Sequence, residues 1–566
     1  MQITRHSHAK AAFPLILLSL FLFFTAGIIP LAAQKAQKPQ TPSQAPTVLK
    51  STTHLVQLNV IVEDHKGQPV FGLKKEDFSL VDEDTKQEIA IFSPASSSNA
   101  SPEPALPPNV FTNREAPDGS SSAVSVILLD SLNTSFEDQV YAKSQVLKLL
   151  RNRQPNEYIA LYFLDDQLYI LQDFTRDSQA LLQAMDRLKP HSSRAFDAST
   201  SRGSALTPAG DTNLSVPGPA SNRDRSASTR TTMDDALDTR IGDTTNAFLS
   251  IANHVAFISG RKSLVWVSGT FPLMAGYGGF GLPPPSADPH SNASEIERAA
   301  RALNRVNMSI YPVDAVGISI SGSHGAFFGR HAKWDAMNLL ADRTGGRAFY
   351  GNNDVAGSVR RAIEDTELTY LLGFYPSHNQ WDGSFHRLKL RLNVPGLHLR
   401  YREGYFAYAD SSDGLGEMQT NLAQAARMRV DSTSLNLRVT LPAKGPSSSH
   451  LLRTFVRVEP SELLFHESDG AHLAALDLLV CQLGSADEFL SADHKHVDLH
   501  LKPSEYDFYM KSGLVLGNPI QVSPVARTLR IFVRDSSGAL GSVTIPLAKY
   551  LSSVPVNPSN KHSQPG

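Results

Sequence analysis

The residue of this chain best placed to do chemistry is an aspartate at the end of an apolar run. The stretch SVILLDSLNTSF spans Ser125 to Phe136, and Asp130 stands where apolar side chains give way to hydroxyl and amide groups. A carboxylate among hydroxyls at the exit of a strand can hold a hard divalent cation through oxygen ligands. It can equally accept hydrogen bonds from loop amides and cap the following helix. The sequence leaves both interpretations open.

An α/β domain over residues 122–368 is expected to position this aspartate. Continuous apolar runs such as AVSVILLD and RKSLVWVSG are typical of strands covered on both faces. Stretches with helical spacing separate them, and Asp177 is placed to cap one such helix. EYIALYFLDDQLYILQDF indicates a hairpin that turns at Asp165-Asp166. This alternation predicts a doubly wound, mostly parallel, Rossmann-like sheet with helices on both faces.

Residues 191–232 interrupt this domain and hold almost no large apolar side chains, so they are expected to be disordered or to form a long surface loop. Period-two patterns on either side of the domain predict β structure. The expected units are a small β module over 52–95, a β extension over 369–410, a helical connector over 411–430 and an immunoglobulin-like β-sandwich over 431–550. Linkers are expected over 34–51 and 96–121, and a disordered tail over 551–566.

The N-terminus predicts export. Arg5 and Lys10 precede a long apolar run, and Ala32 and Ala33 offer a cleavage site, so residues 1–33 are a signal peptide or a membrane anchor. The chain is then expected to be periplasmic, extracellular or anchored to the membrane by this segment.

The net charge and the cysteine count make some classes of function less favoured than others. With 53 basic and 55 acidic residues the formal charge is -2, which disfavours a nucleic-acid partner. Cys481 is the single cysteine and lies in the alternating run ALDLLVCQL, so we expect a buried, inert thiol.

Several motifs taken in order resemble the VWFA-related domain proteins of the acidobacterial type, which contain a von Willebrand factor A-like domain. The motifs are VIVEDHKGQPVFGLKKEDFSLVDED, VILLDSLNT, GRKSLVWVSGTFP, IYPVDA, TGGRAFY and YLLGFYPSHNQWDGSFHRLKLRLNVPGLHLRYREGYFA. The resemblance covers most of the chain. It implies a metal-ion-dependent adhesion site, in which a partner's carboxylate completes the coordination of a divalent cation.

This chain departs from the adhesion-site pattern D-x-S-x-S. Asp130 matches, but Leu132 stands at the first serine position and Thr134 at the second. Thr244 or Thr245 would supply the threonine of the second loop, and Ser268 stands where a later aspartate is expected. The resemblance therefore implies a degenerate site that binds Mg²⁺ or another divalent cation weakly. Asp138 or Asp243 could add charge. Asn133, Ser135 and Thr270 complete the loop face expected to contact a partner.

Other motifs are better explained as loop, surface or core residues than as catalytic or binding sites. GYGGFG, from Gly276 to Gly281, is followed by three prolines that prevent the helix a dinucleotide site needs. Ser319 lacks the glycine of a nucleophile elbow, and His324 and His331 lack a third metal ligand in register. An aromatic set is expected to belong to the core; it comprises Tyr370, Phe374, Tyr375, Tyr401, Tyr405 and Phe406.

The sequence thus predicts a non-enzymatic, adhesion-type protein that binds an envelope or extracellular protein through the loop face around Asp130. Two alternatives stay open. The chain could be a structural component of the cell envelope without metal or ligand binding, or an envelope hydrolase.

Overall fold

The computed structural model describes most of the chain between residues 55 and 547. The described ranges are 55–93, 107–114, 123–154, 157–191, 193–194, 196–197, 219–258, 260–271, 291–316, 324–367, 369–378, 380–408, 429–442 and 451–547. The expected leader, the linker over 34–51, the tail and most of the helical connector over 411–430 lie outside these residues. Within the described residues, no helix has the length and hydropathy needed to cross a membrane.

The central sheet confirms the predicted α/β domain. Its five strands run in the order β10-β9-β6-β7-β8. They are β6 (Ala123–Asp130), β7 (Ile159–Leu164), β8 (Leu168–Thr175), β9 (Arg261–Ser268) and β10 (Met308–Asp314). β6 is parallel to β7 and β9, and β9 is parallel to β10. The predicted hairpin is present, since β8 runs antiparallel to β7. Asp130 is therefore the last residue of the middle strand.

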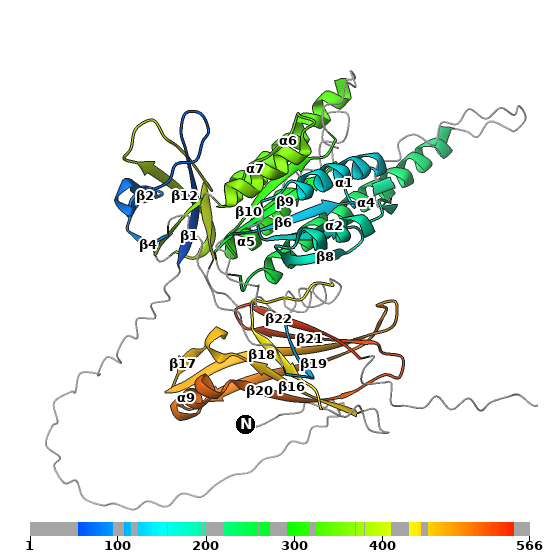
Figure 1. The fold of residues 1–566 in the computed structure, drawn as a ribbon. Coiled ribbons are helices and arrows are strands. Elements are labelled where there is room, and N and C mark those ends of the chain that lie inside the picture. Colours follow the sequence, from blue (N-terminus) through cyan, green and yellow to red (C-terminus); the bar gives the residue numbers. More distant parts are fainter. Residues whose placement is uncertain are drawn as a thin grey trace, which may run out of the picture. The chain divides into compact units, whose positions relative to one another are not determined.

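Helices cover both faces of this sheet (Figure 1). Alternate β6 residues point to opposite sides, so Val126 and Leu128 belong to one core while Ile127 and Leu129 belong to the other. The first core includes α4 (Pro219–His254), α5 (Ser291–Arg305) and α6 (His324–Thr344). The second includes α1 (Phe136–Arg151), α2 (Ser178–Arg187) and α7 (Val355–Glu367). Asp177 caps α2, as its sequence predicts.

Two boundaries in this domain, the start of α4 and the end of α6, relate to features of the sequence. The sequence predicts that the segment 191–232 is disordered or a long surface loop, but α4 begins at Pro219, so the last part of the segment is helical. Low apolar content fails to identify this helix because the large buried side chains described for it, such as Ile241 and Phe248, come later in the same helix. Gly345 follows the end of α6 with φ +80°, a conformation that glycine adopts at little cost.

The expected β module over 52–95 and the β extension over 369–410 are one structure, so their separation was wrong. Their strands form two four-stranded sheets, in the orders β13-β1-β11-β4 and β14-β12-β2-β3. The early strands are β1 (Val56–Glu63), β2 (Phe78–Asp82), β3 (Thr85–Gln87) and β4 (Ile89–Ser93), with a short helix η1 (Lys75–Asp77). The late strands are β11 (Thr369–Phe374), β12 (Asp382–Leu392), β13 (His398–Tyr401) and β14 (Gly404–Tyr408). Both sheets contribute to one hydrophobic core. An alternating pattern shows that a strand has a buried face, but it does not show which strand lies beside it.

The C-terminal β unit also has two sheets around one core. The first sheet contains β20 (Leu514–Gln521), β16 (Leu451–Val458), β15 (Leu437–Thr440) and β5 (Val110–Thr112). The second contains β17 (His466–Ser468), β18 (Ala471–Leu483), β21 (Thr528–Asp535) and β22 (Leu540–Pro546), and β19 (Phe489–Leu501) also pairs with β18. Two short helices, η3 (Pro460–Glu462) and α9 (Pro503–Ser512), belong to this unit.

The expectation that residues 96–121 form only a linker was wrong, because β5 lies within them and pairs with β15. Arg114 then holds the segment with hydrogen bonds of 2.9 and 2.7 Å to the Thr433 carbonyl and an ion pair of 2.5 Å to Glu462. The sequence of this three-residue strand does not predict a strand, because β structure this short depends on the strand beside it.

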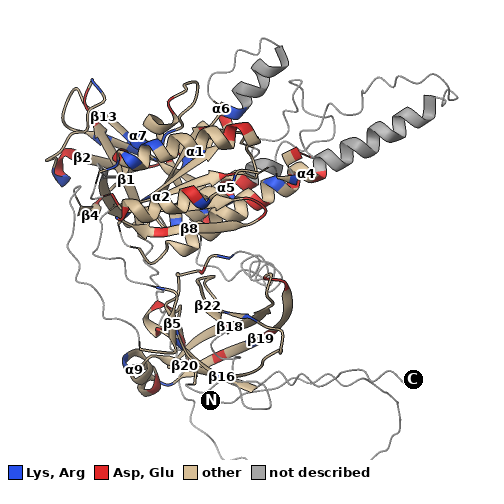
Figure 2. Ribbon diagram, turned by 45° about the vertical axis from the view of Figure 1, so that its right-hand side comes forward, with Lys and Arg blue, Asp and Glu red and all other residues tan. Residues whose placement is uncertain are grey.

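Acidic and basic residues are interspersed on the helices, as Figure 2 shows for α4, α5 and α7. These helices therefore carry charges of both signs.

Candidate functional site

The Asp130 side chain is enclosed at the carboxyl end of β6. It is 3% exposed, and its two carboxylate oxygens accept four hydrogen bonds. The donors are the Asn133 backbone N–H (3.0 Å), the Asn133 side-chain amide (2.8 Å), Trp266 Nε1 (2.8 Å) and Ser268 Oγ (2.9 Å). These bonds use the lone pairs through which a carboxylate would otherwise bind a cation.

Asn133 links this carboxylate to a buried arginine. Its Oδ1 accepts hydrogen bonds from Arg240 Nε (3.1 Å) and Nη2 (2.9 Å), while its amide donates to Thr244 Oγ1 (2.8 Å). Arg240 Nη2 also donates to Thr270 Oγ1 at 2.8 Å. Arg240 is 3% exposed, and the negative charge of Asp130 partly offsets the effect of burial on its pKa. A guanidinium therefore supplies, close to Asp130, the positive charge that a metal ion would supply in an adhesion site.

Two further contacts close the loop after β6 against the loop after β9. Thr134 Oγ1 accepts a hydrogen bond from the Gly269 N–H at 2.8 Å, and the Thr270 N–H donates to the Asn133 carbonyl at 2.8 Å. The loops touch so closely that a Cβ on Gly269 would lie 3.1 Å from the Thr134 Cα. The hydroxyl of Thr134 is therefore an acceptor for a loop amide.

A second carboxylate at the same edge of the sheet is also neutralised. Asp314 ends β10 and is 4% exposed, and Lys333 Nζ lies 2.6 Å from its Oδ1. Lys333 also donates to the Gly269 carbonyl at 2.8 Å, so it joins the ends of β9 and β10. Each of the two carboxylates that end central strands thus has a cationic side chain nearby.

Burial changes the pKa values at this site. Desolvation raises the pKa of the Asp130 carboxyl, while hydrogen bonds from Asn133, Trp266 and Ser268 oppose this rise. Desolvation also lowers the pKa of Arg240 to about 10, which leaves the guanidinium charged at neutral pH. The site therefore holds a fixed cation beside its carboxylate.

These residues do not fit the metal that the family resemblance implies. A dication needs several oxygen ligands with free lone pairs. Here an indole N–H and an amide N–H donate to Asp130, and a guanidinium donates to the oxygens of Asn133 and Thr270. Thr244 Oγ1 donates to the Arg240 carbonyl at 2.7 Å and accepts from Asn133, so it too is engaged. Thr245 Oγ1 is buried and makes no hydrogen bond within the described residues, but one hydroxyl is no cation site. The geometry agrees with the alternative in which Asp130 holds its loop.

The predicted helix cap comes from a different residue. Ser135 caps α1, because its hydroxyl accepts from the Asp138 N–H at 3.3 Å and donates to the Asp138 carboxylate at 2.7 Å. Asp138 therefore contacts the cap, and Asp130 and Thr134 do not provide it.

The remaining sequence candidates are mostly structural. Cys481 is buried, and desolvation raises the pKa of its thiol. Asp165 lies in the β7–β8 turn, 2.7 Å from His191 Nε2. Tyr370, Phe374 and Tyr405 belong to the core, Tyr401 packs against it, Phe406 contacts Phe385, and Tyr375 is exposed. Gly276 to Gly281 and Ser319 lie outside the described residues, as do the side chains of His324 and His331, which fall within α6.

Sequence reasoning missed Arg240 and Trp266, which with Asn133 enclose the carboxylate. A signal for Arg240 existed, since residues four apart share a helix face and Arg240 stands four before Thr244. Trp266 lies in a run of buried apolar residues, so its role as a donor had no local signal.

An apolar surface lies beside this loop. Phe136 and Val140, one turn apart on α1, are 46% and 47% exposed, and α1 starts directly after the loop of Asp130. On the inner side of the same helix, a cavity of about 20 Å³ is lined by Leu129, Phe163 and Val267 among others, which leaves room for little more than one water molecule. The exposed side of α1 therefore offers more to a partner than the interior does.

No family model and no curated protein matches this chain. Solved structures similar to it include an aerotolerance-related membrane protein from Bacteroides fragilis, at 12% identity over 43% of this chain and 98% of that one, with a TM-score of 0.23. The von Willebrand factor domain of the type V pilus tip protein Mfa5 from Porphyromonas gingivalis matches at 10% identity over 43% and 94%, with a TM-score of 0.26. Proximal thread matrix protein 1 from the mussel byssus, with zinc in its MIDAS motif, matches at 8% identity over 46% and 48%, with a TM-score of 0.23. Scores this low support no conclusion about function, and the case for a von Willebrand factor A-related domain lies in the sequence motifs and the observed α/β sheet.

Proposed function

We propose that this chain is a non-enzymatic, exported, adhesion-type protein whose A-like domain binds a protein partner without a bridging metal ion. The binding surface would combine the loop after β6 with the exposed side of α1. The flanking β units, the C-terminal one immunoglobulin-like, would serve as spacers or further contact surfaces.

The observation that carries the proposal is the pair Phe136 and Val140 beside a rigid loop. In open α/β sheets, ligands bind outside the carboxyl ends of the strands. Protein interfaces are centred on exposed apolar and aromatic side chains, and these two residues are half exposed at that end of β6. The hydrogen bonds around Asp130 hold the loop in place, which reduces the entropy lost on binding.

The lack of a metal bridge follows from the charge at the site. Arg240 and Lys333 already compensate Asp130 and Asp314. A partner carboxylate therefore gains no open coordination position here. A structural envelope component without a partner is the alternative, and the experiment below separates the two.

The test is affinity capture from envelope extracts of the source organism, with the chain immobilised. The double variant Phe136→Ser/Val140→Ser should lose a partner that the unchanged chain recovers, and recovery should be the same in EDTA and in Mg²⁺. Phe508→Ser, at a 62% exposed position in α9, is the matched control and should keep the partner. Equal recovery with the double variant would refute this surface, and loss in EDTA would refute the metal-free mode.

A further inference from the structure

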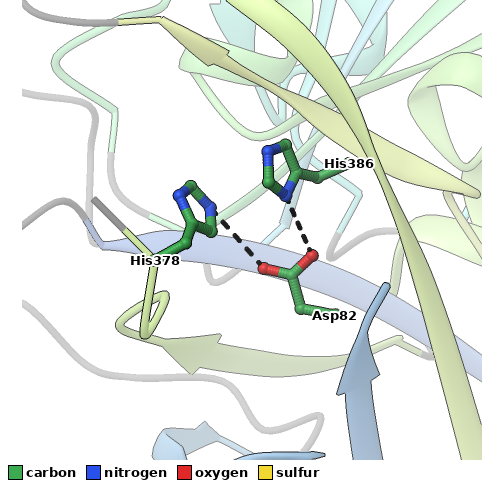
Figure 3. A group of neighbouring side chains, drawn as sticks. All are labelled: Asp82, His378 and His386. Carbon is green, nitrogen blue, oxygen red and sulfur yellow. Dashed lines mark hydrogen bonds and ion pairs between the residues drawn. The ribbon is translucent and has the colours of Figure 1, made fainter. Parts of the chain in front are cut away.

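A second polar cluster lies in the N-terminal pair of sheets and has no part in the loop face. It consists of Asp82, His378, His386 and Tyr405 (Figure 3 shows the first three). Asp82 is the last residue of β2, His386 lies on β12, Tyr405 lies on β14, and His378 lies in the connection between β11 and β12.

Strand register brings three of these residues to one face. Leu388 on β12 pairs with Asp82, and His386 pairs with Tyr405, so His386 is the diagonal neighbour of Asp82. Leu80, Leu388 and Ala407 lie two residues from cluster members on their own strands and belong to the core. Because strand side chains alternate with a period of two, the cluster continues the inward face of this sheet.

Both histidines direct a ring nitrogen at the same carboxylate (Figure 3). His386 Nδ1 lies 3.3 Å from Asp82 Oδ1, and His378 Nε2 lies 3.7 Å from Asp82 Oδ2. All three ligand atoms lie within 4.8 Å of one another, and among the described residues this is the group of histidine, cysteine and acidic side chains with that property. The Tyr405 hydroxyl donates to Asp82 Oδ2 at 2.7 Å and lies 2.7 Å from His378 Nε2.

The loop that carries His378 is held in place. Gln87 on β3 donates a hydrogen bond of 2.9 Å to the hydroxyl of the neighbouring Ser377. The His378 ring stacks on that of His386, with 4.0 Å between centroids.

The acidic member of this cluster, Asp82, is buried. Asp82 is 3% exposed, and its ion-pair partners among the described residues are the two imidazoles. Burying a carboxylate is costly unless an opposite charge lies beside it, and a cation bound between Asp82 and the two imidazoles would reduce this cost.

We propose that Asp82, His378 and His386 bind one divalent transition-metal ion, with zinc as the best match. Two imidazole nitrogens and one carboxylate oxygen are zinc ligands, whereas Mg²⁺ and Ca²⁺ prefer oxygen alone. Bonds of about 2.0–2.1 Å in a tetrahedral site place ligand atoms roughly 3.3 Å apart. Here His386 Nδ1 lies 3.3 Å from Asp82 Oδ1, and His378 Nε2 lies 3.7 Å from the other oxygen, Oδ2. Three protein ligands leave one coordination position open. Tyr405 would orient Asp82 through its hydrogen bond.

The test is titration of the chelator-treated full chain with Zn²⁺, followed by calorimetry and by the melting temperature. One equivalent should bind and raise the melting temperature, because the ion binds the folded state. Co²⁺ in place of Zn²⁺ should give visible absorption bands of a site with nitrogen ligands. His386→Gln and Asp82→Asn should each weaken Zn²⁺ binding by more than about 100-fold, and Tyr405→Phe by about 10-fold.

A second histidine pair supplies the control. His494 and His496 on β19 each lie 2.9 Å from Asp477 Oδ1 and are 44% exposed. His494→Ala/His496→Ala should keep the strong site. The proposal is overturned if this control loses the site, if the chain binds no Zn²⁺, or if His386→Gln, folded by circular dichroism, binds as the unchanged chain does. None of these results depends on whether the loop face binds a partner.

Discussion

At the scale of single residues, the feature that decides the chemistry of the loop face is the set of hydrogen bonds around Asp130. A carboxylate with the same sequence context could ligate a metal, and its neighbours decide otherwise. Trp266, Asn133 and Ser268 donate to it, and Arg240 provides a positive charge nearby. Such a buried network stabilises a loop only while every member is satisfied.

This network predicts a strong effect of Asp130→Asn. An amide in this position presents its own N–H groups to donors, so the variant should lose about 2–4 kcal/mol in the free energy of unfolding. Arg240→Met should also destabilise the fold, and the double variant should cost about 1–3 kcal/mol less than the sum. The measurement is urea unfolding followed by tryptophan fluorescence, since Trp266 donates to Asp130.

Asp138→Asn is the matched control, because Asp138 is half-buried and contacts the Ser135 cap. It should cost less than about 1 kcal/mol. Strictly additive effects of Asp130→Asn and Arg240→Met would show that the two groups do not stabilise each other.

At the scale of elements, α1 shows how local chemistry fixes a boundary. Ser135 accepts a hydrogen bond from the Asp138 N–H, and Glu137 and Asp138 lie in the first turn, where the helix dipole favours negative charge. The helix then carries both the inward residues Ala142 and Val146 and the exposed pair Phe136 and Val140. The start of α1 therefore sets the position of the proposed binding surface.

Ser135→Ala should lower the free energy of unfolding by about 1 kcal/mol, because it removes the cap acceptor. Ser144→Ala, in the exposed middle of the same helix, should change it by less than about 0.5 kcal/mol. Chemical denaturation of the two variants side by side measures the difference. Equal losses would mean that the start of α1 does not depend on its cap.

At the scale of the whole molecule, the α/β domain is inserted in sequence between two halves of one β unit. β1 is paired on one side with β11 and on the other with β13, and β2 is paired with β12. The core residues Leu58 and Val60 therefore depend on strands that follow the α/β domain in the chain.

A fragment of residues 55–368 should consequently leave its first strands unfolded. It lacks β11 to β14, so limited proteolysis with mass spectrometry should find residues 55–93 cleaved while the central strands β6, β7, β9 and β10 stay protected. The fragment 55–408 is the control and should protect both regions. Protection of residues 55–93 in the shorter fragment would show that these strands fold without their partners.

The sequence by itself determined the features that rest on neighbours a few residues away. The apolar run of β6 with Asp130 at its end, the turn at Asp165-Asp166, the Asp177 cap and the α6 end at Gly345 all follow from local patterns. The alternation of such elements was enough to predict the doubly wound domain, because few architectures bury these elements on both faces.

Only the tertiary structure decided which buried faces pack against each other. Asn133 and Arg240 are 107 positions apart, Asp130 and Trp266 are 136 apart, and Asp82 and His386 are 304 apart. A hydrophobic pattern states that a side of a strand is covered, but many distant segments could cover it. Whether Asp130 meets a guanidinium or a metal, and whether Asp82 meets two imidazoles, depends on that long-range pairing.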